Sequence, residues 1–542
     1  MTKWILHLIP VAFCLFAVQA AEREAPPVSV PIPSPIPAPT PKPVAPEPVL
    51  PDNTFDAIEN RIHMFTLDNG FRVILYPRGD APIASFVTYV AAGSVNESLG
   101  ETGIAHLMEH LAFKGTPDIG TRDFAKERTL QAGEDNVWEQ LQTETRKGAR
   151  ADPKTVEALK KRLEALGKSL EECLVSNEFD QLLSRAGGRE TNAFTSADAT
   201  VYYVSLPADK AELWASLESD RFANTQPRQF PRELNVVIEE RRQRTESDPA
   251  GKLYENFRML AFPGHPYGIP TIGFRADLEA MSRRKVLRFY RTHYTPANTV
   301  IAVAGKFDPV AMEALVRRYF GGIPARPAPP PVISVQTPQE GEIRFEIEHP
   351  AQPMLVAGFH VPDELHPDDV PLAILNEILS GGRTSRLYRN LVQTGIALNA
   401  GSFVGFPGHR YPHLFTIRAL PNRGRTLDDV EKALWDEIGK LREELVPDAE
   451  LKRVKTNVRA DMVRELDSNL NMAMGLAGTE SVAGDWRELF REIDELSRVT
   501  AGDVRRVARE YLVPKNRIVG RMKAPPPPAP PAPAAPKPEA PK

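Results

Sequence analysis

The sequence predicts an α+β protein of two related α/β halves, each a mostly antiparallel sheet packed by helices, with a helical hairpin inserted in the first half. The chain has 542 residues, of which 53–522 lie between two Pro-rich ends. These 470 residues are too many for one hydrophobic core. Residues 281–304 resemble residues 499–522 at an offset of 218, so that Asn298 matches Asn516. A repeat of this length indicates duplicated domains.

Runs of alternating apolar residues predict the strands of the first half. Residues 64–76 alternate on both sides of an Asp-Asn-Gly turn, which is typical of two antiparallel strands joined by a tight connection. Residues 83–91 form the next expected strand, and a polar loop leads from it to a helix at 103–116. Residues 191–207 are rich in Thr, Tyr and Val and predict a strand pair, with a helix at 209–224.

Residues 122–186 differ in character, being rich in Glu, Lys, Arg, Gln, Leu and Ala with a break at 148–153. This composition predicts two long amphipathic helices that form a hairpin. Three roles stay open for it, namely a wall of a chamber, a partner-binding surface or a surface decoration.

The N-terminal residues 1–20 are expected to be a cleaved secretory signal, with Lys3 before the apolar run 4–18. That run is interrupted by His7 and Pro10 and is shorter than the ~20 residues that span a bilayer, so we expect no membrane span after cleavage.

Residues 21–54 and 523–542 are dense in Pro and Ala and are expected to be a disordered linker and a disordered tail. Cys173 is then the one remaining cysteine, and export without disulfides indicates a bacterial periplasm or secretion. The net charge of −4 gives no indication of nucleic-acid binding.

His106, Glu109 and His110 form the pattern H-x-x-E-H. On a helix the two imidazoles share one face, one turn apart, and suit Zn²⁺ with a further oxygen ligand and an open position for water. A carboxylate that is not a ligand can take the proton of the attacking water. A surface helix with two solvated histidines is the alternative, but the apolar neighbours Leu107 and Leu111 indicate a largely buried helix whose polar groups need partners.

A third ligand is expected on another helix, and the candidate stretch is 233–242. Glu240 would complete a His₂Glu site, while Glu233, seven residues earlier on the same side, would hydrogen-bond a ligand. By spacing alone, a solvated helix face is the better explanation of either glutamate.

Several motifs in order resemble the pitrilysin family of zinc peptidases, the H-x-x-E-H inverzincins, which include the beta subunits of processing peptidases. The resemblance covers residues 60–522 and rests on Gly93-Ser94 and on the stretches 103–116, 192–203, 233–242 and 265–273.

This resemblance implies one Zn²⁺ per chain held by His106, His110 and Glu240, with Glu109 as general base and Glu233 as a supporting catalytic carboxylate. Glu240 is preferred to Glu239 because it stands seven residues after Glu233. Asn192 and Ala193 are expected to bind substrate at a sheet edge, where an extended peptide adds as a strand.

The resemblance also implies a catalytic domain at 55–322, which contains the insertion 122–186, and a second domain at 339–522 after a Pro-rich linker at 323–338. The second domain has the stretch 380–388 where the first has its histidines, so it is expected to lack a metal site.

Two departures from the family pattern stand out. Glu240 follows His110 by 130 residues, an excess that the hairpin explains. The stretch 391–398 lacks an Arg and a Tyr that active members use to hold substrate. A homo- or heterodimer with a related chain is therefore expected.

The sequence thus favours a zinc metalloendopeptidase that cleaves unfolded or extended peptides in a two-part chamber. The alternatives are a non-catalytic assembly or binding subunit of the same fold, or a catalytic half that is inactive without its partner. The complete set of His106, Glu109, His110 and Glu240 favours the enzyme.

Overall fold

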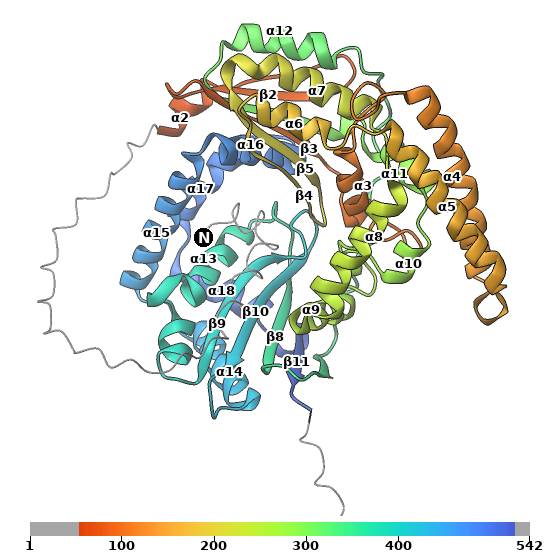
Figure 1. The fold of residues 1–542 in the computed structure, drawn as a ribbon. Helices are drawn as coiled ribbons and strands as arrows, with labels where there is room; N and C mark the ends of the chain where they lie inside the picture. The colour runs from red at the N-terminus through yellow and green to blue at the C-terminus, as the bar shows by residue number, and fades with distance from the viewer. Residues whose placement is uncertain (1–53, 526–542) are drawn as a thin grey trace, which may run out of the picture.

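The computed structural model describes residues 54–525, so the predicted signal peptide, most of the Pro-rich linker that follows it and most of the tail lie outside the described residues. Two sheets with their helices make up the two halves (Figure 1). Within residues 54–525, none of the helices combines the length and the apolar character that crossing a bilayer requires.

The first sheet has six strands in the order β1-β2-β6-β3-β5-β4, and only the β2–β6 pair is parallel. The strands are β1 (His63–Thr66), β2 (Arg72–Pro77), β3 (Ile83–Val90), β4 (Arg189–Thr195), β5 (Thr200–Pro207) and β6 (Thr299–Gly305). Gly70 adopts φ 106° in the turn between β1 and β2, a conformation that glycine tolerates without strain.

The second sheet has five strands in the order β7-β11-β8-β10-β9, and only β7–β11 is parallel. The strands are β7 (Ile343–Glu348), β8 (Met354–Val361), β9 (Ala397–Phe406), β10 (His413–Pro421) and β11 (Arg517–Lys523). The two strand orders correspond from β2/β7 to β4/β9, which confirms the predicted pair of mostly antiparallel sheets.

The repeat seen in the sequence is a repeat in the structure. Helix α11 (Arg283–His293) and strand β6 match α18 (Ala501–Tyr511) and β11 at an offset of 218 residues. Asn298 donates its side-chain N–H to the carbonyl of His293 at 2.9 Å, and Asn516 donates to Tyr511 at 2.9 Å. The same local hydrogen bond therefore fixes the helix-to-strand turn in both halves.

Each sheet is covered on one face by helices of its own half. The first sheet is covered by α3 (Ile104–Ala112), α7 (Ala211–Asn224), α8 (Phe230–Arg241), α11 and α12 (Pro309–Phe320). The second is covered by α13 (Asp369–Ser380), α14 (Leu427–Glu443), α15 (Asp448–Leu466), α17 (Glu488–Arg498) and α18. Two short helices, α2 (Thr54–Glu59) and α10 (Arg275–Glu279), also belong to the first half.

The opposite faces are covered by an exchange of helices between the halves. Helix α16 (Asn469–Ala483) of the second half contacts β3 and β6, and α9 (Pro249–Ala261) of the first half contacts β8 and β11 (Figure 1). Phe257 of α9 is fully buried against Val356 and Ile518 of the second sheet. Each half therefore completes the core of the other.

The inserted hairpin is confirmed, with α4 (Phe124–Thr145) and α5 (Pro153–Cys173) separated at the predicted break. It projects to one side of the molecule (Figure 1). A third helix that was not predicted, α6 (Glu178–Arg185), follows within the range, because Phe179 and Leu183 lie one turn apart and are both buried. The range therefore contains three helices.

Candidate metal centre

Helix α3 begins at a buried acidic cap. Gly103 adopts φ 83° directly before the helix, and the carboxylate of Glu97 accepts the backbone N–H groups of Gly103 at 2.7 Å and Ala105 at 2.8 Å. Burial raises the pKa of Glu97 to about 8, and the two backbone donors oppose this shift. The cap ties the start of α3 to the preceding loop and so fixes the position of the helix face that carries the histidines.

His106 and His110 lie on that face with their ring centroids 4.8 Å apart and their planes at 80°. Leu107 and Leu111 on the other side are fully buried in the first core. The apolar neighbours therefore hold α3 against the sheet and leave the two imidazoles aimed away from it.

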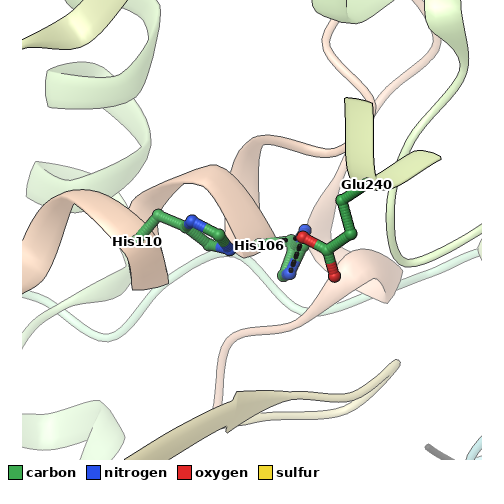
Figure 2. Close-up of side chains that lie close together, drawn as sticks. All are labelled: His106, His110 and Glu240. Atoms are coloured by element: carbon green, nitrogen blue, oxygen red, sulfur yellow. Dashed lines mark ion pairs between the residues drawn. The ribbon is translucent and has the colours of Figure 1, made fainter. Parts of the chain in front are cut away.

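Glu240 reaches the two imidazoles from α8 (Figure 2). Its Oε2 lies 3.5 Å from Nε2 of His110 and 3.8 Å from Nε2 of His106. The three ligand atoms all lie within 4.8 Å of one another. A tetrahedral zinc site separates its nitrogen and oxygen ligands by about 3.3 Å, so small side-chain movements suffice to hold a Zn²⁺ here.

Two cationic side chains orient the carboxylates of α8. Arg244, in the turn that follows α8, pairs with Oε1 of Glu240 at 2.5 Å and leaves Oε2 to the histidines. Lys114 pairs with Oε1 of Glu233 at 2.7 Å, while Oε2 of Glu233 lies 3.8 Å from Nδ1 of His110. Glu233 thus lies beside Nδ1 of His110, while Nε2 of the same ring faces Glu240. A carboxylate in this position orients a metal-binding imidazole.

Glu239, the preceding residue of α8, is exposed and pairs with Arg242 at 2.6 Å. The structure therefore brings together Glu240, and not Glu239, with the histidines.

Glu109 lies beside the imidazoles but does not belong to the group of predicted ligands, His106, His110 and Glu240. The hydroxyl of Thr195 donates to Oε2 of Glu109 at 2.5 Å. Burial raises the pKa of Glu109, and this hydrogen bond opposes the shift. A carboxylate of raised pKa beside a metal site is suited to accept a proton at neutral pH.

The electrostatics of the centre favour a cation. Burial would lower the pKa of His110, but Glu233 and Glu240 raise it to about 9. Burial lowers the pKa of His106 to about 4, which keeps this ring neutral as a metal ligand must be. Nδ1 of His106 is buried without a hydrogen-bond partner among the described residues. Carboxylates that stabilise a proton on His110 also stabilise a divalent cation in its place.

Asn192 and Ala193 lie in β4, the last strand of the first sheet, where they pair with Tyr203 and Tyr202 of β5. Thr195, the partner of Glu109, stands in the same strand. The outer edge of β4 therefore runs past the carboxylate, as strand addition of a peptide requires.

Three residues of the centre were missed from the sequence: Thr195, Lys114 and Arg244. The two cations carry a local signal, because each stands four residues after a ligand, His110 or Glu240. Thr195 carries none, because only the packing of β4 on α3 brings it to Glu109.

Comparisons with known proteins point to one family. The model described as "Insulinase (Peptidase family M16)" matches residues 72–142 and ends inside α4. The model described as "Peptidase M16 inactive domain" matches residues 280–458.

The zinc protease PqqE of Helicobacter pylori is 27% identical over 457 residues, covering 82% of this chain and 89% of that protein. A probable beta subunit of the mitochondrial processing peptidase of Arabidopsis thaliana is 23% identical, covering 87% and 80%.

Solved structures share the fold. A protease from Helicobacter pylori superposes with a TM-score of 0.72 at 24% identity and covers 85% of this chain and 99% of that one. The periplasmic protease PqqL of Escherichia coli gives a TM-score of 0.63 at 17% identity, covering 85% of this chain and 47% of that one.

Proposed function

Since this chain belongs to the M16 family of zinc proteases, we propose that it is a metalloendopeptidase that hydrolyses extended or unfolded peptides with Glu109 as general base. The observation that carries the proposal is the convergence of His106, His110 and Glu240, from two helices, beside a separate carboxylate.

His106, His110 and Glu240 would hold one Zn²⁺ per chain, which would supply Lewis-acid polarisation of the scissile carbonyl and of the attacking water. Glu109 takes the proton of that water and passes it to the leaving amine. Thr195 holds Glu109 in place for this transfer. Glu233 keeps the ring of His110 oriented, and it does so with Lys114 as its own counter-ion.

The substrate is proposed to lie along the outer edge of β4, with its backbone paired at Asn192 and Ala193. The loop after β4 also contacts the second half. Asp198 accepts the hydroxyl of Tyr267 at 2.7 Å and the backbone N–H of His409 at 2.8 Å. This contact supports a reaction chamber built from both halves.

Replacing Glu109 by Gln tests the proposal, because it removes the base and keeps the ligands. Glu109→Gln should retain about one zinc per chain and lose turnover of a quenched unstructured peptide, while His110→Ala should lose both. Hydrolysis by Glu109→Gln at the parent rate would show that the base is assigned wrongly.

A non-catalytic subunit, or a catalytic half that needs a partner, is the second candidate. The lack of an Arg and a Tyr in 391–398 supports it, and the match of 280–458 to the inactive-domain model leaves it open. Peptide hydrolysis by the purified chain, with and without a co-purified related chain, separates the two candidates.

We also propose that the chain is exported by the signal at 1–20 and works in the periplasm, as its structural neighbour PqqL does.

A further inference from the structure

Helix α9 is connected by side chains to both helices that carry the predicted metal ligands. Glu255 and Arg258 stand three residues apart on α9 and therefore share a face. Glu255 contacts α8, and Arg258 contacts the loop that leads to α3. We propose that these two residues are positioning residues, which hold α8 and α3 at the spacing that a metal ion requires. The inference rests on the proposed function and assigns a role to residues outside the metal centre.

On the side of α8, the contact reaches the residue next to a ligand. Arg241 directly follows Glu240 and is only 6% exposed. Its Nη2 donates to Oε1 of Glu255 at 2.7 Å, and its Nη1 donates to the backbone carbonyl of Gly273 at 2.6 Å. Glu246, the other carboxylate near this guanidinium, is farther away, at 3.6 Å. A buried guanidinium depends strongly on its carboxylate partner, so Glu255 fixes the end of α8 that carries Glu240.

On the side of α3, Arg258 supports the acidic cap. Its guanidinium donates to the backbone carbonyl of Tyr267 at 2.5 Å and to the hydroxyls of Thr271 at 3.4 Å and Ser94 at 3.3 Å. The backbone N–H of Glu97, the cap of α3, binds the carbonyl of Ser94 at 3.2 Å. The positive charge of Arg258 also opposes the rise that burial causes in the pKa of Glu97. Arg258 therefore holds the loop from which the helix of the two histidines begins.

The segment that follows α9 links these two contacts. Gly273, whose carbonyl accepts the hydrogen bond from Arg241, also packs against Gly103 at the start of α3. A Cβ atom at Gly103 would lie 2.6 Å from the carbonyl oxygen of Ile272 and 3.0 Å from Cα of Gly273, so no side chain fits there. The arginines of α8 and α9 therefore meet on one short segment, which packs against the start of α3.

The second half fixes another face of α9. Phe257 stands between Glu255 and Arg258 in the sequence, but helical periodicity turns it away from their face. Its side chain is fully buried in the cluster that α9 forms with β8 and β11. A residue can position another helix only if its own helix is held in place. The half without metal ligands therefore supports the metal centre through α9.

Zinc affinity, measured by competition with a chelator, tests the positioning role without relying on peptide hydrolysis. The test variants are Glu255→Ala, which removes the partner of Arg241, and Arg258→Lys, which keeps the charge and loses the fork of donors. Glu255→Gln is the conservative variant, because it removes the charge and keeps a hydrogen-bond acceptor. The matched control is Glu450→Ala, which breaks a similarly buried pair with Arg386, at 2.8 Å, in the second half.

Glu255→Ala and Arg258→Lys should each weaken zinc binding at least about tenfold, while Glu255→Gln should stay within about threefold of the parent. Glu450→Ala should lower the urea midpoint of unfolding as Glu255→Ala does, and leave the zinc affinity unchanged. Equal weakening by Glu255→Ala and Glu450→Ala, or a parent-like affinity in either test variant, would overturn the inference. The expected pattern of zinc affinities in a chain that hydrolyses no peptide would instead contradict the proposed function.

Discussion

At the scale of single residues, the position of Glu109 depends on a side chain that stands 86 residues further along the chain. Thr195 donates the hydrogen bond that fixes one carboxylate oxygen, so the other oxygen is left to accept the proton of water. Preorganisation of this kind is lost when the donor is removed, even though the base itself remains.

Thr195→Val should therefore lower kcat about tenfold while the zinc content stays at about one per chain. Thr195→Ser keeps the hydroxyl and should restore most of the rate. Steady-state kinetics on one unstructured peptide measures both variants. Equal kcat for the valine and serine variants would show that the hydrogen bond has no role in catalysis.

Buried histidines away from the centre make a separate prediction about acid stability. His293 is buried against Phe289, with ring centroids 4.4 Å apart, and burial lowers its pKa to about 4. An unfolded chain has a histidine pKa of about 6.5, so the unfolded state takes up the proton first as the pH falls. The stabilisation is therefore complete above pH 6.5 and is lost between pH 6.5 and 4.

His293→Leu should make the fall in the free energy of unfolding between pH 6.5 and 4 shallower, by up to about 3 kcal/mol. Urea denaturation at several pH values gives this slope. His63→Leu, at an exposed position in β1, is the control and should leave the slope unchanged. The same slope in His293→Leu as in the parent chain would contradict the account.

Sequence reasoning reached part of the centre and not the rest. The spacing of His106 and His110 predicts a shared helix face, which the structure shows. Glu240 was assigned through the resemblance to a family, because by spacing alone an exposed helix face is the better explanation. Thr195 could not be predicted, since its contact with Glu109 exists only after β4 is placed on α3.

At the scale of helices and strands, the exchange of α9 and α16 is the feature that periodicity could not reveal. An amphipathic pattern shows that a helix buries one face, but it does not show which sheet covers that face. Phe257 of α9 makes the exchange specific, because its ring lies 2.6 Å from the position where a side chain at Gly358 would begin. The second sheet thus leaves room at Gly358 for a helix of the first half.

Phe257→Ala should lower the free energy of unfolding by about 3–5 kcal/mol, because it opens a cavity in the core shared by both halves. Met259→Ala, on the same helix at 45% exposure, should change it by less than about 0.5 kcal/mol. Chemical denaturation compares the two variants. Similar losses in both would show that α9 is not buried against the second sheet.

At the scale of the whole molecule, the two related halves could be predicted from the sequence, whereas the way the inserted hairpin folds could not. The offset of 218 residues predicted two related halves, and the matching helix and strand boundaries confirm it. The hairpin is inserted only in the first half, between α3 and β4. The correspondence between the two halves is therefore interrupted next to the candidate metal centre. The cavity between the hairpin and α8 depends on how α4 and α5 fold back, which the composition of 122–186 could not predict.

The central claim is that the first half of the chain carries a single zinc site completed by Glu240, and zinc content tests it most directly. The variants Glu240→Ala and Glu239→Ala change adjacent glutamates of α8, of which only Glu240 reaches the histidines, and can be measured together by elemental analysis after dialysis. The account predicts about one zinc per chain in the parent and in Glu239→Ala, and almost none in Glu240→Ala. Zinc retained by Glu240→Ala and lost by Glu239→Ala, or a parent chain that stays metal-free in zinc, would contradict it.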